Sequence, residues 1–133
     1  MSKDWVKDIH LMQGKYLTRQ WVEQNPEKLK EFLKFRIAFL QEELDETRKA
    51  YMIEDAEEIV DGLIDLCVVA IGTLDAFGVD PYKAWDEVLK ANMNKEVGVK
   101  PTRPNPLGVP DLIKPDDWKA PSHTGNHGKF NDI

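Results

Sequence analysis

A long run of apolar residues at helical spacing most constrains how this chain folds. From position 29 to position 44 these residues recur at steps of three and four: Leu29, Phe32, Leu33, Ile37, Leu40 and Leu44. The spacing predicts an amphipathic helix that starts at Asn25-Pro26-Glu27, an N-cap, first-position proline and acidic first turn, and ends near Tyr51. Asp55 starts a second helix, which is apolar nearly all round from Leu63 to Leu74. That pattern is typical of the central helix of a bundle.

Shorter helices are predicted on both sides of this pair. Residues 2 to 13 form one helix with Gly14 as its stop, whereas residues 15 to 24 are ambiguous. Asp80 and Pro81 start a further helix that runs to about Asn94. No segment has the alternation of a strand, so the sequence predicts an all-α fold with a four- to five-helix bundle core.

The last third of the chain has a different character. Six of the eight prolines fall between Pro101 and Pro121, without periodic apolar positions, which excludes long helices there. We therefore expect one all-α domain over residues 1–95 and an extended arm over residues 96–133. The arm either packs on the bundle or a neighbouring subunit, or forms a lid over an acidic site. Residues 123–127 are expected to be loosely held.

Length and charge narrow the class of protein. A chain of 133 residues with net charge -6 and 41% hydrophobic residues fits one globular domain. Binding of a nucleic-acid polymer is not expected, because it needs clustered basic residues. The sequence shows neither an apolar signal core nor an uninterrupted membrane span. The predicted setting is cytoplasmic, with Cys67, the single cysteine, as a buried thiol and without a membrane partner.

Two rows of carboxylates follow the predicted helix pair. The first row is Glu42, Glu43 and Glu46, and the second is Glu58, Asp61 and Asp65. Residues three and four apart share a helix face, so two antiparallel helices joined by the turn at 52–54 can bring the rows together. Ionised carboxylates this close repel each other unless a cation binds. Ligands that are all oxygen favour Mg²⁺, Mn²⁺ or Ca²⁺ over Zn²⁺.

A structural explanation exists for part of this pattern. The first row, together with Arg48 and Lys49, would also suit an exposed face with ion pairs. Asp65 fits that explanation less well, because it lies between Ile64 and Leu66 and unpaired Asp is rarely buried. A di-iron site is disfavoured, since no histidine follows a glutamate of either row by three residues.

The acidic rows resemble the signature of a known superfamily. Glu42-Glu43-Leu44-Asp45-Glu46, followed by Glu58-Ile59-Val60-Asp61, is similar to the Glu-Glu-x-x-Glu and Glu-x-x-Asp motifs of the all-α nucleoside triphosphate pyrophosphohydrolases. These include MazG proteins, phosphoribosyl-ATP pyrophosphohydrolase and dimeric dUTPases. The similarity covers about residues 27–95, and Lys90 to Lys95 resembles the end of the family's core. In a second register Asp65 is the final acid and Gly62 replaces the glutamate, so both registers stay open.

The resemblance implies a Mg²⁺-dependent enzyme, with Mn²⁺ as a possible substitute, that cleaves nucleoside triphosphates between the α and β phosphorus atoms. It implies metal binding by both rows, with Glu43 or Glu46 as the base. It also implies a homodimer or homotetramer. Six further residues are candidates for substrate binding: Arg36, Lys90 and Lys95 for phosphates, Asn92 for the ribose or base, and His10 and Gln13 for a base pocket. Trp5 and Ile9 are two more residues that could line this pocket.

The leading alternative is a helical regulatory module that binds a metal ion or a nucleotide without catalysis. A third interpretation is a structural bundle whose acidic rows are solvated.

Overall fold

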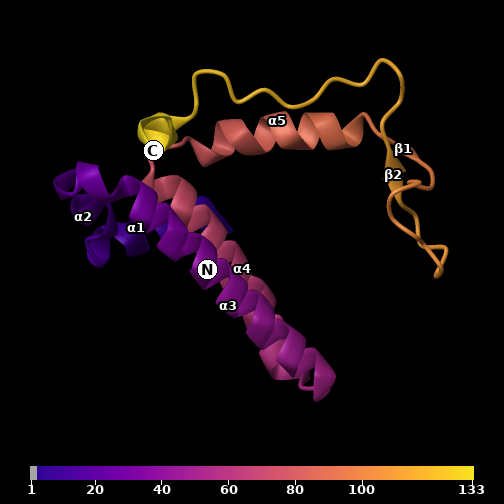
Figure 1. Cartoon of the computed structure of the whole chain (residues 1–133), viewed down its shortest axis with the longest axis horizontal. Helices are drawn as coiled ribbons and strands as arrows, with labels where there is room; N and C mark the ends of the chain where they lie inside the picture. The colour runs from indigo at the N-terminus through magenta and orange to yellow at the C-terminus, as the bar shows by residue number, and fades with distance from the viewer. Residues whose placement is uncertain (1–2) are drawn as a thin grey trace. The chain divides into compact units, whose positions relative to one another are not determined.

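The centre of the fold is a pair of long helices, as the sequence predicts. The computed structural model describes residues 3–133. Helix α3 (Leu29–Met52) and helix α4 (Ala56–Ala76) lie side by side along their length (Figure 1). Glu54 adopts a positive φ in the turn between them, and the Asp55 side chain caps α4 by accepting a hydrogen bond from the Glu58 N–H at 3.2 Å.

Two shorter helices pack against this pair. Helix α1 (Trp5–Lys15) packs mainly on α4, and α2 (Thr18–Gln24) fills the stretch that the sequence left ambiguous. A single 3₁₀ turn, η1 (Pro26–Lys28), leads into α3, so the Asn25-Pro26 start is a tighter turn than predicted. Val22 and Leu29 form the buried core with Ala76 and Phe77. The all-α class is confirmed.

The chain divides into two compact units, and the C-terminal end belongs to the first. Unit 1 comprises residues 1–81 and 126–133, and unit 2 comprises residues 82–125. Phe130 belongs to the short helix η2 (Gly128–Asp132). Its ring stacks on the Phe77 ring, with 4.1 Å between the ring centroids. Asn126 is buried and exchanges two hydrogen bonds with the backbone of Asp80, at 2.8 and 2.9 Å. The prediction of a loosely held segment at residues 123–127 is therefore wrong at Asn126.

Unit 2 contains most of the proline-rich segment. Helix α5 (Pro81–Met93), which begins at the last residue of unit 1, precedes an antiparallel pair of two-residue strands, β1 (Glu96–Val97) and β2 (Leu112–Ile113). No alternating pattern predicted these strands. The Trp118 indole N–H donates to the Ala91 carbonyl at 2.7 Å, which fixes the segment after β2 to the end of α5.

Across residues 3–133, every helix is too short or too polar to cross a lipid bilayer.

Candidate active site

The candidate site lies where the carboxylate rows of α3 and α4 meet. Thr47 and Gly62 face each other here, and a Cβ at position 62 would lie 2.2 Å from Thr47 Oγ1. Only glycine permits this approach of the two backbones. Because the helices run antiparallel, this contact places Glu43 opposite Asp65 and leaves Glu58 about two helical turns from Glu43.

Electrostatic coupling joins the two rows at Glu43 and Asp65. Burial raises the pKa of Glu43, and the charges of Asp65, Glu46, Glu42 and Asp61 raise it further. Burial also raises the pKa of Asp65, with added contributions from the charge of Asp61 and a hydrogen bond between the two side chains. Four of the other predicted ligands therefore act on Glu43, whereas Glu58 is not among the groups that raise its pKa.

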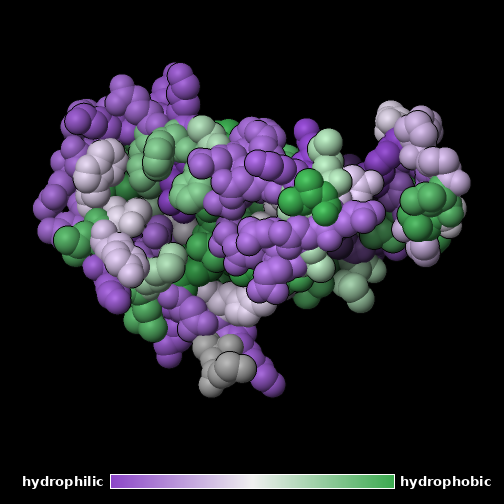
Figure 2. Space-filling view, turned by 90° about the horizontal axis from the view of Figure 1, so that it is seen from below, coloured by the Kyte–Doolittle hydropathy of each residue, from purple (hydrophilic) through white to green (hydrophobic). Residues whose placement is uncertain are grey.

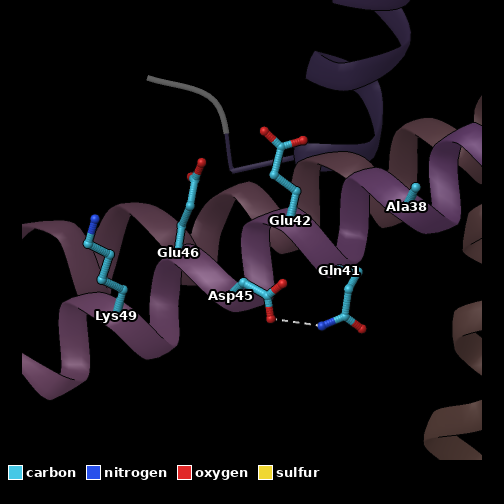
Figure 3. Close-up of a pocket in the computed structure, with 6 residues that line it drawn as sticks. All are labelled: Ala38, Gln41, Glu42, Asp45, Glu46 and Lys49. Atoms are coloured by element: carbon cyan, nitrogen blue, oxygen red, sulfur yellow. Dashed lines mark hydrogen bonds between the residues drawn. The ribbon is translucent and has the colours of Figure 1, made fainter.

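Part of the first row also borders an open pocket. Glu42 and Glu46 extend from one side of α3 with Lys49, while Gln41 and Asp45 lie on the other side, joined by a hydrogen bond of 2.9 Å (Figure 3). The pocket has a volume of about 380 Å³ and is lined by these five residues and Ala38. Glu42 and Glu46 therefore face solvent, whereas Glu43 is directed into the α3–α4 seam.

The chemistry of this cluster suits a hard cation. Oε2 of Glu43 is buried and has no hydrogen-bond partner, and the ion pairs of residues 3–133 do not include Glu43 or Asp65. A buried carboxylate oxygen without a donor is costly, and a divalent cation would remove this cost. In the part of the chain that is described, no three His, Cys, Asp or Glu side chains converge tightly enough to form a ready-made metal site.

Three predicted substrate-binding residues instead contact the C-terminal half of α4. Gln13 is buried and its amide donates to the Gly72 carbonyl at 3.0 Å. The buried Arg36 guanidinium donates to Thr73 Oγ1 at 3.0 Å and to the Val69 carbonyl at 3.1 Å, and burial lowers its pKa. These contacts fix α1 and α3 on α4.

His10 contacts the same helix at Asp75. His10 Nδ1 lies 2.6 Å from Asp75 Oδ1, and Arg19 bridges the other oxygen of that carboxylate at 3.0 Å. The contacts of His10, Gln13 and Arg36 place each beside α4, and a role in substrate binding stays a prediction.

The remaining predicted substrate residues belong to unit 2. Lys90 and Asn92 are exposed on α5. Lys95 follows the helix, and its Nζ lies 5.6 Å from the centroid of the Trp118 ring. Lys114 Nζ lies 4.7 Å from the same centroid. Lys95 therefore takes part in a cation–π contact within unit 2. Its contact with phosphate stays a prediction.

Two features of unit 1 were not predicted. Gly62, a departure from the acidic motif, sets the approach of α3 to α4. A second pocket is lined by Trp21, Lys28, Glu31, Phe32 and Phe35. The available signal was Phe35, which lies on the same helical face as Glu42, seven residues away.

One comparison with known proteins gives a match. The family model of phosphoribosyl-ATP pyrophosphohydrolase matches residues 16–92, more than half of the chain. The match covers α2, α3 and α4, and most of α5. The chain matches none of the curated proteins and none of the solved structures with which it was compared.

Proposed function

We propose that this chain, which belongs to the phosphoribosyl-ATP pyrophosphohydrolase family, cleaves a nucleoside triphosphate between the α and β phosphorus atoms. Family membership makes the protein a hydrolase acting on an acid anhydride. The proposed products are a nucleoside monophosphate and pyrophosphate. The observation that carries this proposal is the meeting of the two carboxylate rows, where Oε2 of the half-buried Glu43 has no hydrogen-bond partner and where burial and neighbouring carboxylates raise the pKa values of Glu43 and Asp65.

The proposal includes Mg²⁺, or Mn²⁺, as the cofactor. Glu43, Asp61 and Asp65 would hold it in the seam, with Glu42 and Glu46 at the open side, and Glu58 as a more distant candidate. When bound, such a cation supplies charge neutralisation for the phosphates and lowers the pKa of water.

The carboxylates also supply the base. A raised pKa brings a carboxylate closer to neutral pH, which makes it a better proton acceptor for an attacking water. Glu43 has this property through burial and its neighbours. Glu46 is the second candidate, since it faces the open pocket from the next turn of α3. Lys90, Lys95 and Asn92 are proposed to bind the phosphates and the ribose or base.

We further propose that the protein works as a homodimer or homotetramer in the cytoplasm. Val60, Leu63 and Ile64 of α4 are 64%, 52% and 44% exposed in the single chain, although the sequence predicted a central helix. Figure 2 shows hydrophobic residues open on the molecular surface among hydrophilic ones. A second copy would cover the exposed positions of α4.

A substrate panel tests the proposed reaction. The protein is incubated with Mg²⁺ and each common nucleoside triphosphate, deoxynucleoside triphosphate or phosphoribosyl-ATP. Release of pyrophosphate and monophosphate is expected, whereas orthophosphate would indicate cleavage at another bond. Binding of a nucleotide without turnover of any substrate would contradict the proposal and support a regulatory module. Glu43→Gln serves as the inactive control.

A further inference from the structure

A second pocket in unit 1 lies outside the carboxylate site. It has a volume of about 350 Å³ and is formed where α2, η1 and α3 meet. Five side chains line it: Trp21, Lys28, Glu31, Phe32 and Phe35. Three of these are aromatic, and the volume is near the lower end of the range for small-molecule sites, about 300–1,000 Å³. The pocket therefore suits one planar ring system better than a large ligand.

The aromatic side chains of the pocket are in contact with the buried core, and two of their rings are partly exposed. The Trp21 and Phe32 rings lie 5.5 Å apart between centroids, and Phe32 contacts the fully buried Phe77 at 5.8 Å. Phe35, by contrast, is 62% exposed, and Trp21 is 41% exposed. Exposed aromatic rings supported by a rigid core offer flat surfaces on which a planar ligand can stack.

The pocket and the carboxylate site lie along one face of α3, with no lining residue in common. At 100° per residue, Phe35, Ala38, Glu42 and Glu46 fall within about 80° of helix surface. Phe35 and Glu42 are seven residues apart, which is about 10 Å along the helix axis. Ala38, the small residue between them, lines the acidic pocket. A nucleoside triphosphate whose phosphates are held at the carboxylates would reach the aromatic pocket with its base.

The polar residues of the pocket add a preference among bases. Glu31 presents a carboxylate, which only accepts hydrogen bonds when ionised, and Lys28 presents an ammonium group, which only donates. A base with an exocyclic amino group beside a ring nitrogen or carbonyl oxygen matches both. Uracil and thymine, which carry two carbonyl groups around one N–H, match Glu31 less well.

We propose that this pocket binds the nucleobase of the substrate, with Trp21 and Phe35 as stacking residues and Glu31 as the residue that favours amino-bearing bases. The proposal rests on the proposed function, because that function places the phosphates at the carboxylates. It relocates base recognition from the sequence-predicted lining at His10 and Gln13, which contact α4.

Phe35→Ala is the leading test, because Phe35 is more exposed than the two other aromatic side chains of the pocket and its loss should leave the fold intact. Ile37→Ala is the matched control, since Ile37 lies on the opposite face of the same helix and is 57% exposed. We expect Phe35→Ala to raise KM for an amino-bearing nucleoside triphosphate about tenfold, in line with the contribution of one stacked aromatic ring, and Ile37→Ala to leave it unchanged. Trp21→Phe should retain most of the affinity that Trp21→Ala loses.

Inorganic tripolyphosphate separates the base site from the phosphate site. It has no base, so its inhibition constant should be the same for wild type and Phe35→Ala. An equal loss of tripolyphosphate and nucleotide affinity, or an unchanged KM, would overturn the proposal. Glu31→Gln should reduce the preference for amino-bearing bases over uracil, and an unaltered preference would remove Glu31 from the site.

Direct binding keeps the test independent of turnover. Equilibrium dialysis with an α,β-methylene nucleoside triphosphate and Mg²⁺ measures affinity even if the wild type hydrolyses no nucleotide. In that case the proposed function fails, whereas a tenfold loss of affinity in Phe35→Ala still supports the base site. Equal affinities of Phe35→Ala and wild type would reject the base site, whether or not the enzyme is active.

Discussion

At the scale of single residues, Glu43 is the group on which both stability and chemistry depend. Its Oε2 atom is buried without a hydrogen-bond partner, and burial and four neighbouring carboxylates raise its pKa. The folded chain therefore retains a proton that the unfolded chain releases at the ordinary carboxylate pKa of about 4. The stabilising contribution of protonation is present at low pH and is lost as the pH rises through the raised value.

This sign gives a pH-dependent prediction for Glu43→Gln. In metal-free buffer the variant should be more stable than wild type at neutral pH, and the advantage should shrink as the pH falls toward about 4. Urea unfolding of both proteins across this range measures the difference. The Leu112 N–H and Arg103 lower the pKa of Asp111, so the contribution of Asp111 to stability falls at low pH. This contribution is the same in both proteins and cancels in the difference between them. A constant difference across the range would contradict the prediction.

Metal binding should reverse that order of stability. At a Mg²⁺ concentration of about 100 times Kd, wild type should gain about 2.7 kcal/mol of unfolding free energy, and Glu43→Gln should gain much less. Thermal unfolding with and without Mg²⁺ tests this, with Ca²⁺ as a second hard cation. Equal gains in both proteins would place the cation elsewhere.

The choice between the register Glu58–Asp61 and the register that ends at Asp65 is also a question at this scale. Asp65 is coupled to Glu43 and Glu58 is not, so Asp65→Asn should weaken Mg²⁺ binding at least tenfold, about 1.4 kcal/mol. Glu58→Gln should change it little. Isothermal titration of the two variants decides between the two motif registers, and a larger effect of Glu58→Gln would restore the first register.

At the scale of helices, the contact of Gly62 with Thr47 sets the separation of the two carboxylate rows. Gly62→Ala should force α3 and α4 apart and destabilise the protein by about 1–3 kcal/mol, despite the better helix propensity of Ala. Magnesium affinity should fall with it. The double variant with Thr47→Ala removes the atom 2.2 Å away, and should recover stability and Mg²⁺ affinity together. Recovery of neither would show that the helices are not held at this contact.

At the scale of the whole molecule, the C-terminal residues complete the core of unit 1. Asn126→Ala should lower the unfolding free energy by about 2 kcal/mol, because it removes two hydrogen bonds to the Asp80 backbone. Lys129→Ala is the control, since Lys129 contributes its backbone N–H to Phe77. Chemical denaturation of both variants measures the difference. Equal stabilities would show that the last residues do not hold unit 1 together.

Local signals in the sequence were enough to predict the helices that carry the site. Period and capping signals predicted α3, α4 and α5 to within a few residues, because helix periodicity and N-caps are local properties. They also predicted the acidic rows and the all-α class. Residues 15 to 24 stayed ambiguous, since α2 has seven residues and a short helix depends on tertiary packing.

The contacts between these helices could not be predicted from such signals and are known from the tertiary structure. It showed that Asp65 rather than Glu58 is coupled to Glu43, since the register of two helices depends on a distant contact, Thr47 with Gly62. It also placed Gln13 and Arg36 against α4, and joined Trp21 to Phe35 in one pocket. A sequence records spacing along one helix, whereas the partner across a helix interface follows from packing in three dimensions.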